Sequence, residues 1–285
     1  MNKPVGSFIF VFCIFGQSFD ATASHNQQRK PAARPKCEKV IRVPVLETGV
    51  VASKVDGKWE GLSIEFMNDL LKDTDCTYKT IEMPLARIWV SLENGDLEML
   101  PIAAYAPNRA KITYSFELMK AYFGFSYLGQ ADDPAIEQKI KNKTAKIGFM
   151  RGNRSVAEMN PMLSGYPPSK IMESTDIPTL VNLLRLGRID AIYSHPYALL
   201  KALRSQQVEK EWQVYVQPDA AIVQLSAFLS NQMNEADKTL LRKLMNDYIS
   251  QGRHWLAIER MLGAPLTKRL KNEQDQIIKI QKKSQ

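Results

Sequence analysis

The chain has 285 residues, of which 45% are hydrophobic and 24% are charged, and its formal net charge is +8. This balance is typical of a folded globular protein and excludes the disordered and fibrous classes. Residues 266–285 carry six basic and two acidic side chains, so we expect a solvated basic tail at this end. The basic residues are not interleaved with aromatic ones, and nucleic-acid binding is therefore not expected.

The chain begins with the features of a secretory signal. Lys3 gives a basic start, residues 8–15 form an apolar run, and Ala21 and Ala23 stand at the positions of a small-residue cleavage signature. We expect residues 1–23 to be a signal peptide that is removed on export. A membrane anchor is the alternative, but the apolar run is much shorter than the ~20 residues that cross a bilayer.

A polar segment with two prolines follows the signal, and regular elements come after it. Residues 24–36 are expected to be a disordered linker. Apolar runs and helical spacings then predict a strand, a helix, a strand, a helix and a strand, at residues 40–46, 62–73, 77–83, 85–93 and 97–102. Short right-handed crossovers turn this order into a parallel, doubly wound α/β sheet. An aromatic-rich extended segment, residues 114–128, then leads away from the sheet.

The second half repeats the alternation. In chain order the pattern predicts a strand, a helix, a strand, a helix, a strand, a helix and two extended runs, at residues 146–150, 155–162, 170–173, 177–186, 190–194, 197–205, 212–216 and 222–230. The last run returns to the first sheet. A long helix follows the N-cap residue Asn234, breaks near Gly252 and resumes over residues 254–262.

One sequence pattern occurs in both halves of the chain. In residues 92–100 and 184–192 an amphipathic helix ends at a glycine, Gly95 or Gly187, and a short apolar strand containing or following an acid comes next. The glycines stand 92 positions apart, which is too far for a solenoid repeat and suits two similar lobes. We therefore predict two α/β lobes with a cleft and a hinge between them. The first lobe comprises residues 37–120 and 222–265, the second residues 121–221, and the basic tail residues 266–285.

Two cysteines remain once the signal is removed. Cys37 precedes the first predicted strand and Cys76 precedes the second. If these strands are parallel neighbours, both thiols lie at the amino-terminal edge of one sheet, and export permits a disulfide. We predict a bridge between them. Two unrelated thiols are the alternative, because the sequence supplies no distance.

Ligands of open α/β sheets bind beyond the carboxyl ends of the strands. The side chains expected at those ends are Glu47 after the first strand, residues 102–109 after the third, residues 152–155 at the start of the second half, and Ser194 and His195 after the last parallel strand.

Four segments in the order of the chain carry a family resemblance. They are Gly-Lys-Trp-Glu-Gly-Leu-Ser-Ile-Glu-Phe at 57–66, residues 107–116 with their Pro-Asn-Arg-Ala-Lys and Tyr-Ser-Phe pieces, the strand and glycine turn at 147–152, and residues 187–194. Together they resemble bacterial family 3 solute-binding proteins, the periplasmic receptors of polar amino-acid ABC transporters. The resemblance covers residues 40–262 and implies a type II periplasmic-binding fold that closes on its ligand.

The resemblance also implies roles for single residues. Arg109 matches the arginine that clamps the ligand carboxylate, a role that suits the planar donor fork of a guanidinium; a surface arginine after a turn is the alternative. Ala104 stands where a hydroxyl residue often helps to bind that carboxylate, and Tyr105 beside it is a candidate for stacking on a ligand. His195 stands where an acid normally receives the ligand ammonium, and an imidazole is a poor counter-ion for it. A simple strand end before Pro196 is the other reading of His195.

Other candidates would add charge to the cleft. Arg154 lies with Asn153 and Ser155 in the turn that opens the second lobe, and its size departs from the small residue common there. Arg87 is a third candidate cation, with an exposed helix arginine as the alternative. Such a cleft favours an anionic ligand, and Glu47 is the residue that would restore some cation binding.

These features predict a periplasmic receptor that binds a small polar, carboxylate-bearing solute by hinge closure, as a monomer and without a cofactor or metal. Its partner would be an ABC transporter permease or a membrane sensor, and the sequence leaves both open. The alternative is a periplasmic lyase or dehydratase in which His195 and Glu47 act as acid and base. The sequence has no nucleophile elbow, phosphate loop or zinc-type histidine pair.

Overall fold

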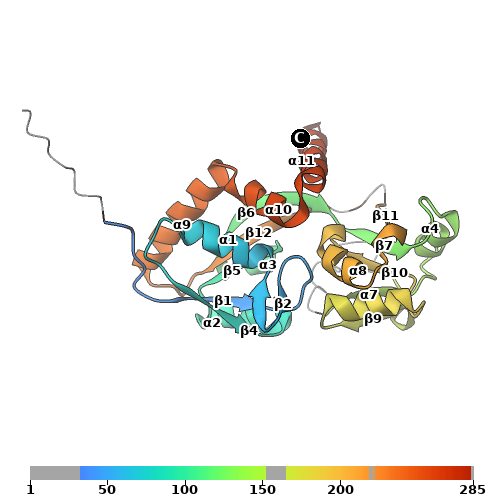
Figure 1. The fold of residues 1–285 in the computed structure, drawn as a ribbon, viewed down its shortest axis with the longest axis horizontal. Coiled ribbons are helices and arrows are strands. Elements are labelled where there is room, and N and C mark those ends of the chain that lie inside the picture. The colour runs from blue at the N-terminus through green and yellow to red at the C-terminus, as the bar shows by residue number, and fades with distance from the viewer. Residues whose placement is uncertain (1–32, 152–164, 218–219, 221, 284–285) are drawn as a thin grey trace, which may run out of the picture. The chain divides into compact units, whose positions relative to one another are not determined.

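The computed structural model describes residues 33–151, 165–217, 220 and 222–283, and residues 34–285 form a compact unit (Figure 1). The expected signal peptide, most of the expected linker and the expected helix 155–162 lie outside the described residues. Among the helices that the structure describes, none combines the length and the apolar character needed to cross a bilayer.

The first lobe begins with the predicted parallel pair of strands. Strand β1 (Ile41–Val45) pairs in parallel with β4 (Tyr78–Glu82). Helix α1 (Leu62–Leu71) connects them, after a hairpin formed by β2 (Ser53–Val55) and β3 (Lys58–Glu60). The apolar positions of α1 at helical spacing are buried, as the periodicity predicted. Helix α2 (Leu85–Asn94) follows β4.

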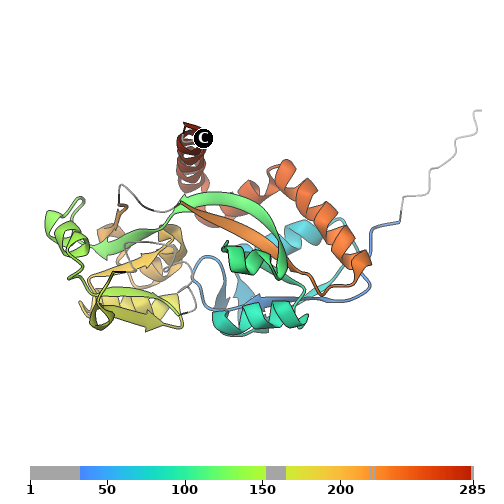
Figure 2. The same cartoon turned by 180° about the vertical axis from the view of Figure 1, so that it is seen from behind.

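The rest of this lobe is antiparallel. Strand β5 (Met99–Ala104), the returning strand β12 (Ile222–Ser230) and β6 (Thr113–Tyr122) form a sheet in the order β5-β12-β6. Figure 2 shows β6 and β12 running side by side, and their pairing extends from Thr113 opposite Ser230 to Tyr122 opposite Ile222. This sheet is antiparallel throughout and separate from the parallel β1–β4 pair, whereas the sequence pattern predicted that residues 97–102 would join one parallel sheet.

The second lobe is a five-stranded sheet in the order β11-β7-β10-β8-β9. The strands β8 (Ile147–Met150), β9 (Ile171–Ser174) and β10 (Ala191–Ser194) are parallel, and β7 (Gly124–Leu128) and β11 (Trp212–Tyr215) are antiparallel to β10 and β7 respectively. The expected extended segment 114–128 is thus two strands, because the chain leaves β6 at Tyr122 and enters β7 at Gly124.

The described part of the second lobe contains the helices α4 (Pro134–Lys141), α7 (Ile177–Arg185) and α8 (Leu200–Ser205), with 3-10 turns at Pro168–Lys170, Pro196–Leu199 and Glu209–Glu211. Helix α4 was not predicted. Its start signal is nevertheless present, since Asp133 caps the helix by accepting the N–H of Ala135 and a proline occupies the first turn.

The repeated sequence pattern around Gly95 and Gly187 adopts the same turn in both lobes. Gly95 and Gly187 have φ angles of 77° and 64°, in the left-handed region that favours glycine. The N–H of Gly95 donates to Leu92 O, and the N–H of Gly187 donates to Leu184 O, at 3.3 and 3.0 Å. The next residue in each copy, Asp96 or Arg188, donates its N–H back to the helix as well. The predicted helix caps are therefore confirmed.

Three helices complete the chain. Helix α9 (Glu235–Ser250) is capped by Asn234, whose side chain accepts the N–H of Asp237, and α10 (Arg253–Leu262) begins after Gly252. A solvated tail was expected at residues 266–285, but its residues 266–283 instead belong to α11 (Ala264–Lys283). Leu270 and Ile277 of α11 are buried, and Leu270 packs with Met119 of β6. The apolar residues of this stretch recur at helical spacing, and burying them outweighs the solvation of its lysines.

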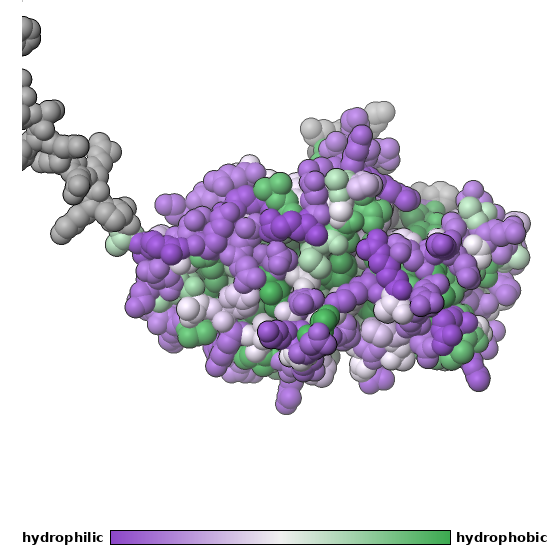
Figure 3. Space-filling view, viewed as in Figure 1, coloured by the Kyte–Doolittle hydropathy of each residue, from purple (hydrophilic) through white to green (hydrophobic). Residues whose placement is uncertain are grey.

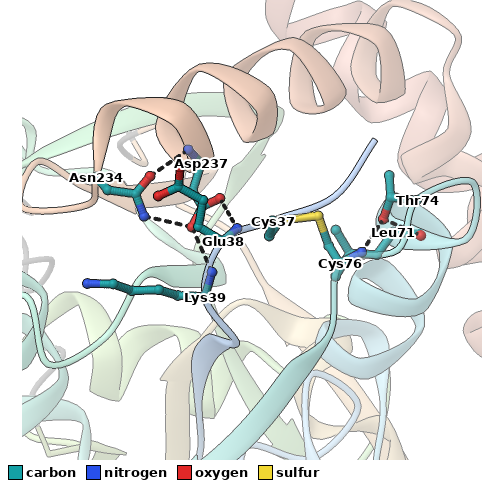
Figure 4. Close-up of a disulfide and its surroundings, with 8 residues drawn as sticks. All are labelled: Cys37, Glu38, Lys39, Leu71, Thr74, Cys76, Asn234 and Asp237. Atoms are coloured by element: carbon teal, nitrogen blue, oxygen red, sulfur yellow. Dashed lines mark hydrogen bonds between the residues drawn. A yellow bond between two sulfur atoms is a disulfide. The ribbon is translucent and has the colours of Figure 1, made fainter. Parts of the chain in front are cut away.

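The predicted disulfide is present (Figure 4). Cys37 and Cys76 are bonded, with their Cα atoms 4.8 Å apart. Asp237 of α9 accepts the backbone N–H groups of Glu38 and Lys39 at 2.7 and 3.2 Å, so the segment that carries Cys37 is also tied to the carboxyl-terminal helices. The bridge closes the β1–α1–β4 unit at the amino-terminal edge of its strands.

Candidate functional site

A cavity of about 180 Å³ opens at the carboxyl ends of strands from both lobes. Thr48 lies beyond β1, Ala104 ends β5, Met150 ends β8, and Ser194 and His195 end or follow β10; all of them line the cavity. This is the place that the topology of open α/β sheets predicts for a ligand. We refer to it as the cleft. In the space-filling view, hydrophobic residues on this face of the molecule gather mainly between the two lobes, below α11 (Figure 3).

Among the described residues that line the cleft, Arg109 is the one Asp, Glu, Lys or Arg. It lies on the short helix α3 (Pro107–Ala110), which follows β5, and the side chain of Asn108 accepts its backbone N–H at 3.0 Å. The guanidinium donates to Ala104 O at 2.6 Å and lies over the ring of Trp89, with Cζ 4.1 Å from the ring centroid. Only 4% of Arg109 is exposed. A carbonyl and an aromatic face therefore hold the cation in place.

Burial shapes the electrostatics of this arginine. Desolvation lowers the pKa of Arg109 to about 10, so the side chain stays protonated at neutral pH. A guanidinium that is removed from water gains from an incoming anion, and its planar donors fit a carboxylate in two parallel hydrogen bonds. The arrangement is chemically suited to binding a carboxylate.

His195 contributes a neutral group to the side of the cleft that the second lobe forms. Its ring lies 5.7 Å from the ring of Tyr197 and 6.5 Å from that of Phe123, between centroids. Removal of the imidazole from water lowers the pKa of His195 to about 4, so the side chain is uncharged at pH 7. Ser194 donates its hydroxyl to His195 O at 3.3 Å. The strand end after β10 thus presents polar atoms without charge.

Three further candidates from the sequence are not among the residues that line the cleft. The carboxylate of Glu47 accepts the N–H of Lys54 at 3.0 Å and so stabilises the loop between β1 and β2. Tyr105 packs against the cluster that contains Ile88 and donates its N–H to Gln224 O at 2.7 Å. Arg87 is exposed on α2. The structure therefore does not bring Glu47 and His195 together as an acid–base pair in the cleft.

Three of the predicted site residues belong to the turn at residues 152–155. Asn153, Arg154 and Ser155 lie outside the described residues. Of the sequence-based candidates that are described, the structure brings Ala104, Arg109, Ser194 and His195 together in the cleft.

Sequence reasoning missed three residues of this region. Trp89, which supports the Arg109 guanidinium, lies on α2, and Phe123, which faces His195, lies at the crossover between lobes. His254 of α10 also lines the cleft; its Nδ1 is buried without a hydrogen-bond partner, and burial lowers its pKa to about 4. No local motif marks these residues, because Phe123 and His254 reach the cleft, and Trp89 reaches Arg109, only through packing between distant segments.

No family model matches the chain, and no curated protein matches it in sequence. Solved structures do match. One is an ABC uptake transporter substrate-binding protein from Streptococcus pneumoniae with bound histidine, at 14% identity and a TM-score of 0.64, over 79% of this chain and 93% of that chain. A second is an arginine-, lysine-, histidine-binding protein from the thermophilic bacterium Geobacillus stearothermophilus, at 14% identity and a TM-score of 0.62, over 82% of this chain and 100% of that chain. A histidine kinase sensor domain similar to periplasmic binding proteins matches at 13% identity and a TM-score of 0.63, over 79% of this chain and 96% of that chain.

The chain has the type II periplasmic-binding-protein fold. The expected fold class is thereby confirmed. At these identities the likeness concerns the fold alone, and the relatives described are binding proteins and a sensor domain rather than enzymes. In this periplasmic-binding fold the cleft described above lies at the strand ends of both lobes.

Proposed function

We propose that this protein is an exported solute receptor that captures a small carboxylate-bearing ligand, an amino acid or a related organic anion, by closing its two lobes over the cleft. The observation that carries the proposal is the buried Arg109 guanidinium in a cleft at the strand ends. A guanidinium at this position offers planar donors that match the two oxygens of a carboxylate. The small volume of the cavity, about 180 Å³, is in keeping with a ligand smaller than a typical drug molecule.

Closure would use contacts that already join the lobes. The N–H of Val50, in the loop after β1, donates to Ala198 O of the second lobe at 3.3 Å. The ammonium of Lys201 in α8 donates to the hydroxyl of Ser53 in β2. A Cβ added at Gly49 would lie 2.1 Å from Ala198 O, so this loop approaches the second lobe as closely as glycine allows. These contacts support an interface that forms and opens with the ligand.

Location and partner are part of the same proposal. The expected signal at residues 1–23 and the disulfide both fit a periplasmic protein, since disulfides persist in oxidising compartments. Several of the solved structures of this fold belong to ABC transporters, and we infer that this receptor delivers its ligand to such a transporter. A membrane sensor is the other possible recipient, because a sensor domain shares the fold.

A thermal-shift screen tests the proposal. Amino acids, dicarboxylates, sugar acids and aliphatic or aromatic monocarboxylates are added one at a time, and a bound ligand should raise the melting temperature as RT ln(1 + [L]/Kd). The best carboxylate is then titrated by calorimetry. Its concentration should stay constant during incubation; consumption of the ligand would instead indicate an enzyme.

Variants identify the clamp. Arg109→Gln keeps a donor for the Ala104 carbonyl but removes the charge, and we expect the affinity for a carboxylate to fall roughly 100-fold or more. Arg188→Ala, which removes an exposed arginine beyond α7, serves as the matched control and should bind like the wild type. Circular dichroism confirms that both variants fold. Equal affinities of Arg109→Gln and the wild type would show that Arg109 is not the clamp.

A further inference from the structure

The cleft extends from the strand ends into the interior of the first lobe. Besides Arg109 and His195, residues of α1, β6 and α10 line it, and α1 packs against α10. We call the part between these elements the inner chamber; it is lined by Ser63, Phe66, Leu118, His254, Ala257 and Ile258. None of the six is more than 8% exposed. A ligand group that enters the inner chamber therefore leaves bulk water.

His254 brings a polar atom into these surroundings. It lies in the first turn of α10, and its ring is 5.3 Å from the ring of Trp255 and 6.5 Å from that of Tyr248, between centroids. Nδ1 is buried, and among the described residues no group forms a hydrogen bond with it. A buried nitrogen of this kind costs free energy whether it carries a proton or a lone pair. A guest that hydrogen-bonds to Nδ1 would recover that cost.

Two neighbours of His254 also have buried polar atoms without a hydrogen-bond partner in the described part of the chain. These atoms are Tyr248 Oη and Arg253 Nε. The Arg253 guanidinium lies over the Tyr248 ring, with Cζ 5.0 Å from its centroid, and Tyr248 packs edge-on against Phe66 with 4.9 Å between the ring centroids. Buried polar atoms in folded proteins are almost always paired. Three such atoms behind one wall of the chamber favour a guest with a polar group at this end.

A hydroxyl is the polar group that suits this end of the chamber best. It can donate to Nδ1 of one imidazole tautomer and accept from Nδ1–H of the other. It is uncharged, so contact with Phe66 and Ile258 costs it less than it would cost an ionised group. A second carboxylate would gain little from Arg253, because this guanidinium already donates to Asp69 O and lies 3.9 Å from the Asp69 carboxylate.

We propose that the ligand carries a hydroxyl group remote from its carboxylate and that this hydroxyl binds His254 in the inner chamber. This inference rests on the proposed function and names a ligand class within it. The carboxylate binds at Arg109, and the hydrocarbon between the two groups contacts Phe66 and Ile258. His254 is then a specificity-determining residue, because an acid without the hydroxyl leaves Nδ1 unpaired in the complex.

Pairs of acids that differ by one hydroxyl test the proposal. They are butyrate and 4-hydroxybutyrate, hexanoate and 6-hydroxyhexanoate, 3-phenylpropionate and 3-(4-hydroxyphenyl)propionate, and L-phenylalanine and L-tyrosine. The pairs differ in length, and the last one keeps an ammonium group constant. Each acid is titrated into the full-length protein by calorimetry. We expect the hydroxylated member of at least one pair to bind roughly tenfold or more tightly than its partner.

Variants assign the preference to the inner chamber. His254→Phe replaces the imidazole by an apolar ring, and we expect it to bind both members of the selected pair with similar affinity. His254→Gln keeps a hydrogen-bonding group and should retain part of the preference. Leu256→Ala, which changes a side chain on the exposed face of α10, is the matched control and should bind like the wild type. Melting curves without ligand show which variants fold, and His254→Leu makes the same test if His254→Phe does not.

Different results would overturn different parts of the scheme. If no pair shows a preference for the hydroxylated acid, or if the preference persists undiminished in His254→Phe, the ligand class proposed here is wrong while a carboxylate receptor remains. If no carboxylate of the thermal-shift screen binds in an Arg109-dependent way, the proposed function itself is wrong.

Discussion

The two lobes contain the same helix–glycine–strand turn, but the strands that follow it bring different chemistry to the cleft. The turns at Gly95 and Gly187 share their left-handed conformation and their hydrogen bonds to the preceding helix. Beyond β5 the chain delivers the buried cation Arg109, and beyond β10 it delivers the neutral His195. The backbone unit fixes where a candidate side chain stands, and the surrounding side chains decide its charge.

The surroundings of the two residues explain the difference. Arg109 keeps its proton because guanidinium is strongly basic, and its cost of burial is offset by a carbonyl and by the face of Trp89. An imidazole is much less basic, and the aromatic rings of Phe123 and Tyr197 offer it no charged partner. Desolvation therefore leaves the arginine charged and the histidine neutral at pH 7.

The largest expected difference between the lobes concerns stability. The disulfide closes the first lobe over a sequence separation of 39 residues, and residues 121–221 contain no cysteine. We expect the double variant Cys37→Ser, Cys76→Ser to lose about 4 kcal/mol of unfolding free energy, chiefly because its unfolded chain is less constrained. Denaturant unfolding measures the loss. Hydrogen exchange should rise in β1 and β4 more than in β8 to β10, and a uniform rise would contradict the comparison.

The two glycines should differ in their tolerance of alanine. A Cβ at Gly95 would lie 2.8 Å from the Cβ of Gln232, whereas a Cβ at Gly187 meets nothing within 4 Å. Both substitutions cost about 1–2 kcal/mol for the left-handed backbone, and Gly95→Ala should cost roughly a further 1 kcal/mol or more for the close contact. Thermal and denaturant melts of the two variants check this. Equal losses would mean that the turns are equivalent in packing as well as in backbone.

The neutral histidine makes stability depend on pH. The pKa of His195 is lowered from its ordinary 6.5 to about 4, so between these values the unfolded chain binds a proton that the folded protein does not. Stability therefore falls as the pH drops through this window. From pH 7 to pH 5 the wild type should lose about 1–2 kcal/mol more than His195→Asn. His254 adds the same trend in both proteins, and parallel pH profiles would show that His195 is not buried as described.

The smallest expected effect concerns the starts of the two repeated helices. Asp176 caps α7 by accepting the N–H of Thr179 at 2.7 Å, whereas Pro84, before α2, provides no side-chain cap. Asp176→Ala should cost about 1 kcal/mol. Asp176→Asn, which retains a capping oxygen, should cost a few tenths of that amount. A melt of the two variants compares them, and equal stability of Asp176→Ala and the wild type would rule out a capping role.

Local patterns were enough for most of the fold. The alternation of apolar runs and helical spacings located β1, α1, β4 and α2 to within a few residues, and the glycine turns identified the internal repeat. Helix α4 and the folded basic end were missed for a physical reason. Helix α4 has only one fully buried residue, Ile140, so its apolar stripe is weak, and the lysines of α11 obscured the buried spacing of Leu270 and Ile277.

The sequence by itself predicted the order of the elements, the cysteine pair and the strand ends that line the cleft, because these depend on local periodicity and on general rules of chain topology. Only the tertiary structure decided what surrounds those strand ends. It placed Trp89 beneath Arg109, Phe123 beside His195, and Glu47 on the backbone of its own loop instead of in the cleft. The charge state and the apolar character of a site depend on burial among residues that are far apart in the chain, and no local pattern encodes those contacts.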